Sequence, residues 1–201
     1  MDSAEGLART DFGSEHPSRT TPMRGGRARY RSVLFVCQAN TSRSIMAEAL
    51  LQHRLAARGL DGEVRVRSAG MAPYARDGAL VSLDTRLVLR EWGIELPPDK
   101  AATDLKTNPG LLVEADLVLT MTEEQAAILR HRLPPPAAAK VAALKAFVGE
   151  GGDIADPAGC EEAVFAACRD EIGRCIDALL TRLFQEVPLP REPGGAGPRD
   201  R

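Results

Sequence analysis

The chain has 201 residues, of which 44% are hydrophobic, and this length and composition suit one domain with terminal tails. Its formal net charge is -2 at pH 7. Because the chain is nearly neutral and lacks a lysine or arginine block between those tails, we expect no nucleic acid partner. No apolar run approaches the roughly 20 residues of a membrane helix, and no signal-peptide core is visible, so we expect a cytoplasmic protein with no membrane partner.

Both ends of the chain have compositions typical of disorder. Residues 1–29 mix serine, threonine, glycine and both signs of charge without apolar periodicity, and residues 187–201 are rich in proline, glycine and arginine. Neither segment can bury enough apolar surface to become ordered, so we predict two disordered tails. The folded domain then spans residues 30–186.

Strand and helix patterns alternate within this domain. Apolar runs predict strands at 32–36, 63–70, 115–121 and 140–147, the last being ambiguous because alanine also favours helix. Apolar residues three and four apart predict helices between the first strand and Arg58, and over 79–92, 122–133 (with Thr122 as N-cap) and 160–184. This alternation predicts an α/β fold: four parallel strands with helices on both faces, and ligands bound at the strands' carboxyl ends.

A cysteine and an arginine flank the loop after the first strand. Cys37 ends the strand and Arg43 follows six residues later, where the helix begins. The backbone N–H groups of such a loop, together with the helix N-terminus, form a site for an oxyanion. A guanidinium pairs with two phosphate oxygens at once, and the same field favours a reactive thiolate. The predicted phosphate-binding residues are Gln38, Ala39, Asn40, Thr41, Ser42, Arg43 and Ser44.

The bare spacing of this cysteine and arginine occurs by chance in many proteins, so the loop's other residues matter. Asn40 tolerates the left-handed backbone angles of a tight loop, and the Ser44 hydroxyl can brace the loop or assist the sulfur. Ordinary turn and cap chemistry would also explain both residues. The remaining cysteines, Cys160, Cys168 and Cys175, lack metal-binding or disulfide spacing, and the last two are expected to fill the core or the surface of a helix.

The segment VCQANTSRSIMAEAL (36–50) resembles the phosphate loop of the low-molecular-weight protein tyrosine phosphatase family, V-C-x-x-N-x-x-R-S. The resemblance extends over residues 31–185, through SAG (68–70), ADLVLTMT (115–122) and DIADPAG (153–159). It implies a hydrolase that removes phosphate from phosphorylated proteins or small substrates through a phosphocysteine intermediate. It also implies a metal-free and cofactor-free mechanism, and we expect a monomer.

The resemblance assigns roles to individual residues. Cys37 is the nucleophile, Arg43 holds the phosphoryl oxygens, and Asp156 of the Asp-Pro pair protonates the leaving group and later activates water. Ser68 corresponds to the family's loop-bracing serine. The segment LPPDK (96–100) has no counterpart of a histidine that the family often carries, so Asn40 is expected to be held less firmly.

Two positions bear on the substrate. Thr41 resembles the bacterial protein-arginine phosphatases, and its hydroxyl can accept from guanidinium N–H groups, which favours phosphoarginine. Ala158 stands where tyrosine phosphatases carry an aromatic residue after Asp-Pro. The arginine phosphatases also have a D-P-F-G pattern there, and this chain lacks that phenylalanine. Tyr74 and Trp92 are the remaining aromatic candidates near the mouth, with core packing favoured for Trp92. The choice between phosphotyrosine and phosphoarginine stays open.

Two other functions are compatible with the loop. A thiol-dependent arsenate reductase shares this fold, although the cysteines of an intramolecular cascade are missing, since none lies between Cys37 and Cys160. A non-catalytic protein that binds phosphorylated residues is the second alternative. The joint presence of Cys37, Arg43 and Asp156 argues against it.

Overall fold

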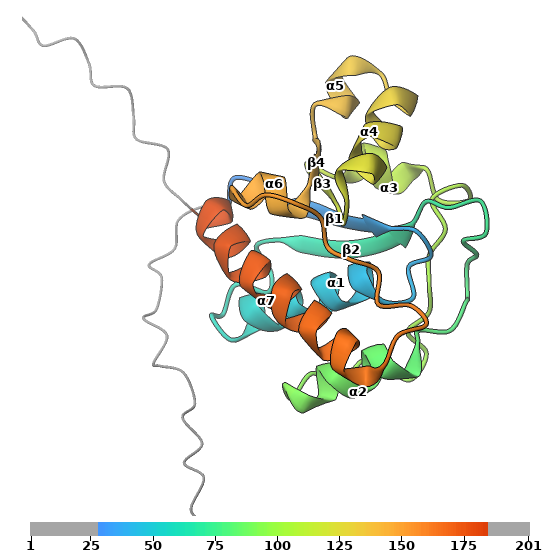
Figure 1. The fold of residues 1–201 in the computed structure, drawn as a ribbon. Coiled ribbons are helices and arrows are strands. Elements are labelled where there is room, and N and C mark those ends of the chain that lie inside the picture. The colour runs from blue at the N-terminus through green and yellow to red at the C-terminus, as the bar shows by residue number, and fades with distance from the viewer. Residues whose placement is uncertain (1–27, 185–201) are drawn as a thin grey trace, which may run out of the picture.

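The computed structural model describes residues 28–184, which form an α/β fold around a parallel sheet (Figure 1). In chain order the elements are β1 (Ser32–Cys37), α1 (Arg43–Ala56), β2 (Arg65–Gly70), α2 (Leu83–Glu91), α3 (Gly110–Glu114), β3 (Leu117–Thr120), α4 (Glu123–Arg132), α5 (Pro135–Ala138), β4 (Val141–Ala143), α6 (Leu144–Val148) and α7 (Glu162–Phe184). The strand order is β2-β1-β3-β4, and each neighbouring pair is parallel. The strand that carries Cys37 is therefore central.

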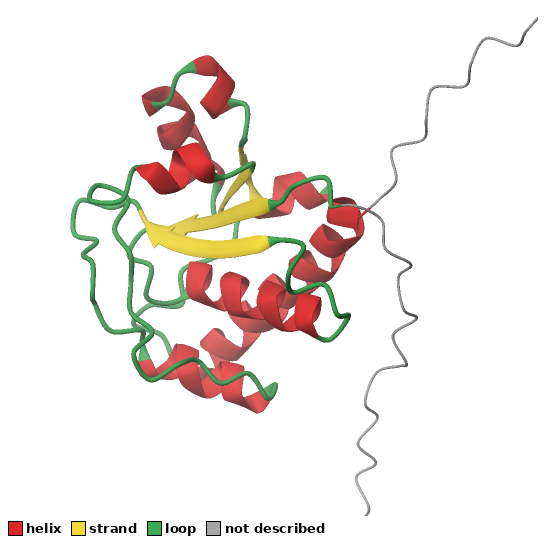
Figure 2. Ribbon diagram, turned by 180° about the vertical axis from the view of Figure 1, so that it is seen from behind, coloured by secondary structure: helices red, strands yellow, loops and turns green. Residues whose placement is uncertain are grey.

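Apolar side chains cover both faces of the sheet. In β1, Val33 and Phe35 belong to the core formed with α1 and α7, whereas Leu34 and Val36 belong to a second core with residues of α3 and α4. Helices accordingly lie on both sides of the sheet (Figure 2), and α2 packs on α7. The predicted four-stranded parallel sheet with helices on both faces is confirmed.

The predicted elements occur in the predicted order, and their ends differ where short-range patterns mislead. Thr122 is the N-cap of α4, as predicted, and accepts from the Gln125 N–H at 3.2 Å. The run at 140–147 was predicted as a strand, but only β4 is extended and the chain continues as α6. Alanine and leucine favour helix, and Gly149, at φ 90°, ends that helix. The short helices α3 and α5 were not predicted, because four or five residues show no period.

The described chain begins two residues before the predicted domain boundary. Ala28 is buried, and the Arg29 N–H donates to the Leu183 carbonyl at 2.9 Å. The rest of the predicted tails, residues 1–27 and 187–201, lies outside the described residues, as do the last two residues of the predicted domain. Between residues 28 and 184, no helix has the length and apolarity needed to cross a bilayer.

Candidate active site

The candidate site lies at the carboxyl end of β1, in the loop that leads into α1. Cys37 is the last residue of β1 and Arg43 is the first residue of α1. Asn40, between them, has φ 61° and is the one non-glycine residue with a positive φ within residues 28–184. Asparagine adopts this conformation more readily than most residues, so it suits the tight turn that returns the loop toward Cys37.

The sulfur of Cys37 faces the inside of this loop. The side chain is 3% exposed, and Sγ accepts a hydrogen bond from the Asn40 backbone N–H at 3.2 Å. The Ser44 hydroxyl lies 3.0 Å from the same sulfur. The Cys37 sulfur therefore lies within hydrogen-bonding distance of one backbone N–H group and one hydroxyl group.

Arg43 links the phosphate loop to the Asp-Pro loop. Its guanidinium is 4% exposed, donates to the Ile154 carbonyl at 3.0 Å and forms an ion pair with the Asp156 carboxylate. Asp156 is half exposed and accepts from the Ala158 N–H at 3.2 Å. The structure thus brings the Asp-Pro loop to the phosphate loop, as the sequence predicts, with Ala158 exposed beside it.

Asn40 is held by three partners. Its Nδ2 donates to the Ser44 hydroxyl at 2.8 Å and to the Ser68 hydroxyl at 2.9 Å. Its Oδ1 accepts from the Thr103 N–H at 2.7 Å. The structure places Ser68 where the resemblance expects it. The expectation that Asn40 is held less firmly is wrong, because both amide hydrogens and the amide oxygen have partners.

Behind Ser68 lies an ion pair that sequence reasoning missed. The Ser68 hydroxyl lies 2.5 Å from Glu48 Oε2, and Lys100 Nζ lies 2.8 and 2.7 Å from the two Glu48 oxygens. The available signal was Glu48 itself, which is the one polar residue among the buried residues of α1 after Ser44, because a buried carboxylate requires a cation or other donors.

Gly70, at the end of β2, supports the phosphate loop from the neighbouring strand. A Cβ at this position would lie 2.8 Å from the Ala39 carbonyl carbon and 2.9 Å from the Gln38 oxygen. The backbones are also joined directly, because the Met71 N–H donates to the Cys37 carbonyl at 3.0 Å. Only glycine permits this approach. Sequence reasoning assigned it no role, although it ends the SAG segment.

A cavity of about 380 Å³ opens beside the phosphate loop, and we name it the rim cavity. Residues of the loop and of the segment after β2 line it: Ala39, Thr41, Tyr74, Ala75, Arg76, Asp77, Gly78 and Ala79. The Ser82 N–H donates to the Thr41 carbonyl at 3.0 Å, and the hydroxyls of Ser42 and Ser82 lie 3.4 Å apart. The phosphate loop is therefore also tied to the start of α2.

The two aromatic candidates have different environments. Tyr74 is 63% exposed on the wall of the rim cavity. Trp92 packs against the core, close to Gly173 of α7, and the Arg169 guanidinium lies 4.6 Å from the centre of its ring. The core-packing interpretation of Trp92 is confirmed, and Tyr74 shares the rim cavity with Ala39 and Thr41 of the phosphate loop.

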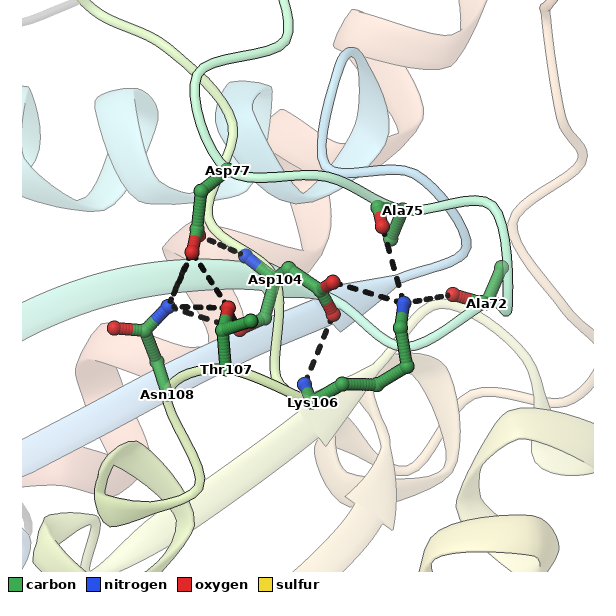
Figure 3. A network of polar contacts seen from close by, with 7 residues as sticks. All are labelled: Ala72, Ala75, Asp77, Asp104, Lys106, Thr107 and Asn108. Carbon is green, nitrogen blue, oxygen red and sulfur yellow. Dashed lines mark hydrogen bonds and ion pairs between the residues drawn. The ribbon is translucent and has the colours of Figure 1, made fainter.

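Charged side chains fasten the segment after β2 to residues 104–108 (Figure 3). Asp77 accepts from the Asp104 N–H at 2.7 Å and from Thr107 Oγ1 at 2.5 Å. Lys106 Nζ donates to the Ala72 and Ala75 carbonyls and pairs with Asp104 at 2.9 Å. Hydrogen bonds, above all from Thr107, lower the pKa of Asp77, and the hydrogen bond from Lys106 lowers the pKa of Asp104.

The remaining cysteines belong to a different environment. Burial raises the pKa of Cys168 to about 12 and that of Cys175 to about 11, so both are neutral thiols near pH 7. Of the two places expected for them, core or surface, the structure puts both in the core. Cys160 is exposed, and no disulfide joins the cysteines, all of which lie in the described part of the chain.

Comparison with known proteins identifies the family. The model of the low molecular weight phosphotyrosine protein phosphatase family matches residues 32–189. The chain is 40% identical over 155 residues to a protein-arginine-phosphatase of Geobacillus stearothermophilus, covering 77% of this chain and 97% of that relative. It is 34% identical over 129 residues to low molecular weight protein-tyrosine phosphatase A of Mycobacterium tuberculosis, covering 62% and 74%.

Solved structures give the same assignment. The YwlE arginine phosphatase from Geobacillus stearothermophilus matches with a TM-score of 0.66 at 40% identity, covering 76% of this chain and 92% of that chain. A mutant of YwlE arginine phosphatase with a phosphorylated active-site serine matches with a TM-score of 0.68 at 33% identity, covering 76% and 95%. Given this fold, this loop and these relatives, the chain belongs to the low molecular weight phosphotyrosine protein phosphatase family, whose members are hydrolases.

Proposed function

We propose that this chain, a protein phosphatase by its family, hydrolyses phosphoarginine in proteins through a phosphocysteine intermediate on Cys37. The observation that carries the preference for phosphoarginine is Thr41, which lies in the phosphate loop and lines the rim cavity. Threonine at this position is the feature by which the loop resembles the arginine phosphatases. The 40% identity to a protein-arginine-phosphatase, along 97% of that relative, supports the same preference.

In the first step, Cys37 Sγ attacks phosphorus and forms an S–P bond while the P–N bond to the substrate guanidine breaks. Asp156, in its acid form, gives its proton to the departing nitrogen. Arg43 and the backbone N–H groups of the loop bind the phosphoryl oxygens, where negative charge must be stabilised. The contact between Arg43 and Asp156 supports the position that this role requires, because it places the carboxyl group of Asp156 beside the anion site.

In the second step, water attacks phosphorus and the S–P bond breaks. Asp156, now ionised, accepts a proton from the water, and the electron pair of the broken bond returns to the Cys37 sulfur. Inorganic phosphate leaves, and the thiolate and the protonated carboxyl are restored. Positive charge and N–H groups supply the electrostatic stabilisation in both steps.

The environment of Thr41 suits a guanidine better than a phenyl ring. A threonine hydroxyl accepts hydrogen bonds from guanidine N–H groups and can orient the attacking water. Ala158 and Gly159, exposed after the Asp-Pro pair, form no aromatic wall for a phenyl ring. The relatives reported above are all named phosphatases, so they lend no support to an arsenate reductase or to a non-catalytic binding protein.

The test compares kcat/KM for phosphoarginyl and phosphotyrosyl peptides of one sequence, with the wild-type chain, Thr41→Ile and Thr41→Ser. We expect the wild type to prefer phosphoarginine. Thr41→Ile should lose at least about tenfold on that peptide alone, equivalent to roughly 1.4 kcal/mol of transition-state binding, and Thr41→Ser should keep most of it. A wild-type preference for phosphotyrosine would overturn the proposal. A phosphoarginine preference that survives Thr41→Ile would show that Thr41 is not the selector.

We also propose that the protein is a cytoplasmic monomer that needs no metal or cofactor and has no nucleic acid partner. Light scattering of the full chain across a range of concentrations tests the monomeric state, and activity after chelation tests independence from metal. A mass of two chains, or a loss of turnover that added metal restores, would contradict this proposal.

A further inference from the structure

We infer that Lys100 is a positioning residue for Cys37, acting through a continuous chain of hydrogen-bonded side chains. The intervening residues, all buried, are in order Glu48, Ser68, Asn40 and Ser44. The inference rests on the proposed role of Cys37 as nucleophile. It extends the site to a lysine whose side chain is 25% exposed and whose side-chain hydrogen bonds, among residues 28–184, both go to Glu48.

Lys100 defines the outer end of this chain. Its ammonium group only donates, and it lies within 2.8 Å of both Glu48 oxygens. A carboxylate held in this way only accepts, so the Ser68 hydroxyl, 2.5 Å from Glu48 Oε2, uses its one proton for Glu48. Ser68 Oγ is then available only as an acceptor on its inner side.

Asn40 continues the chain in a fixed orientation. The Thr103 N–H donates to Asn40 Oδ1 at 2.7 Å, so the amide nitrogen must point the other way. The amide nitrogen then donates hydrogen bonds to Ser68 Oγ at 2.9 Å and to Ser44 Oγ at 2.8 Å. Each of these hydroxyl oxygens accepts one hydrogen bond from Asn40, which matches the acceptor role assigned to Ser68.

Ser44 delivers the last hydrogen bond. Because its oxygen accepts from Asn40, its own proton is directed to Cys37 Sγ at 3.0 Å, beside the Asn40 N–H. A donor at this position stabilises sulfur as an anion, both before attack and when phosphorus leaves it. The other charged groups of the site, the Arg43 guanidinium and the Asp156 carboxylate, contact each other and are not part of this chain.

Removing the charge at residue 100 should loosen this chain at its outer end. Glu48 is 6% exposed, and a buried carboxylate that loses its cation must turn toward water or other donors to offset the cost of desolvation. Such a movement takes Glu48 Oε2 away from the Ser68 hydroxyl and weakens the hold on Asn40. The orientation of Ser44 toward the sulfur then becomes less defined, so attack by Cys37 slows.

The experiment uses the full chain with Lys100→Met, Lys100→Gln and Lys100→Arg, and with Lys145→Met as a matched control. Lys145 forms an equally short ion pair, 2.7 Å, with Glu171 of α7. The readouts are kcat and KM on a phosphoarginyl peptide, and the pH dependence of Cys37 alkylation by iodoacetamide, followed by mass spectrometry of its peptide. Circular dichroism confirms folding, and the Gln variant serves if the Met variant does not fold.

We expect Lys100→Met and Lys100→Gln to lower kcat about fivefold with little change in KM, and to move Cys37 alkylation to higher pH. Lys100→Arg should keep most of the wild-type kcat and the wild-type pH dependence of alkylation. Lys145→Met should match the wild type in both measurements. Wild-type kcat and alkylation in the two neutral variants would overturn the inference, as would an equal loss in Lys145→Met. The proposed function fails separately, if Cys37→Ala keeps turnover.

Discussion

The guanidinium of Arg43 and the carboxylate of Asp156 form an ion pair, although 113 residues separate them in the chain. The pair joins the phosphate loop at the end of β1 to the Asp-Pro loop that precedes α7. The group proposed to bind the phosphoryl oxygens thus contacts the group proposed to protonate the leaving atom. The contact therefore brings together the two segments, 37–44 and 153–159, that carry the resemblance to the phosphatase family.

Asp156→Asn should remove the proton donor and leave the anion site in place. We expect kcat on a phosphoarginyl peptide to fall about 100-fold or more, because a guanidine leaves poorly without a proton. The loss should be smaller for para-nitrophenyl phosphate, whose leaving group needs little protonation. Steady-state kinetics on both substrates make the comparison.

Asp153→Asn is the matched control for this substitution. Asp153 lies in the same loop, but its carboxylate accepts from the Glu123 N–H at the start of α4. We expect kcat within about twofold of the wild type. Equal losses in the two variants, on both substrates, would mean that Asp156 only shapes the loop.

Gly70→Ala should disturb the phosphate loop from behind. The new methyl group would lie 2.8 Å from the Ala39 backbone, which cannot move without shifting the loop. We expect the free energy of unfolding to fall by about 1–3 kcal/mol, as for other overpacked sites, and kcat/KM to fall as well. Urea unfolding and steady-state kinetics measure the two effects.

Gly62→Ala is the control for the added methyl group, because nothing lies within 4 Å of a Cβ at that position. It should leave both the free energy of unfolding and kcat/KM close to the wild-type values. If Gly70→Ala also left the free energy of unfolding and kcat/KM unchanged, the close contact between β2 and the phosphate loop would matter for neither stability nor activity.

The network around Asp77 should stabilise the protein above the acid range and lose this effect on acidification. Hydrogen bonds lower the pKa of Asp77 in the folded state below its usual value of about 3.9. The folded state then binds fewer protons than the unfolded state at low pH, so stability rises with pH through this range. The contribution is complete above about pH 4 to 5 and disappears as the pH falls through the folded-state pKa.

Urea unfolding of the wild type and Asp77→Asn at several pH values tests this linkage. We expect a clear difference in the free energy of unfolding at pH 7 that shrinks toward pH 3. Asp61→Asn is a suitable control, since within residues 28–184 the Asp61 side chain forms no hydrogen bond or ion pair. A difference between wild type and Asp77→Asn that stays constant from pH 7 to pH 3 would contradict the assignment.

The sequence predicted the parts of the site that are contiguous or follow a strand. Cys37 and Arg43 share one loop with Asn40, so their spacing and polarity carried the prediction of an anion site. Asp156 was reached only through the resemblance, because nothing local distinguishes an acid in a turn from an ordinary Asp-Pro turn.

The residues that were missed depend on contacts between distant segments. Lys100 and Glu48 meet only after α1 packs beside the segment that follows α2, and Gly70 matters because β1 and β2 end side by side. The extended run predicted at 140–147 failed for a related reason. An alanine-rich segment follows its tertiary surroundings, and here only Val141–Ala143 pairs with the sheet.

The most direct test of the central claim, that Cys37 accepts the phosphoryl group, is to look for the S–P bond. Asp156→Asn, supplied with para-nitrophenyl phosphate, should retain attack but hydrolyse the intermediate slowly, because no carboxylate activates water. Mass spectrometry of the denatured chain should find one phosphoryl group, on the peptide that contains Cys37, and none when Cys37 is also changed to alanine. Turnover without such a species, or a phosphoryl group on another residue, would contradict the account.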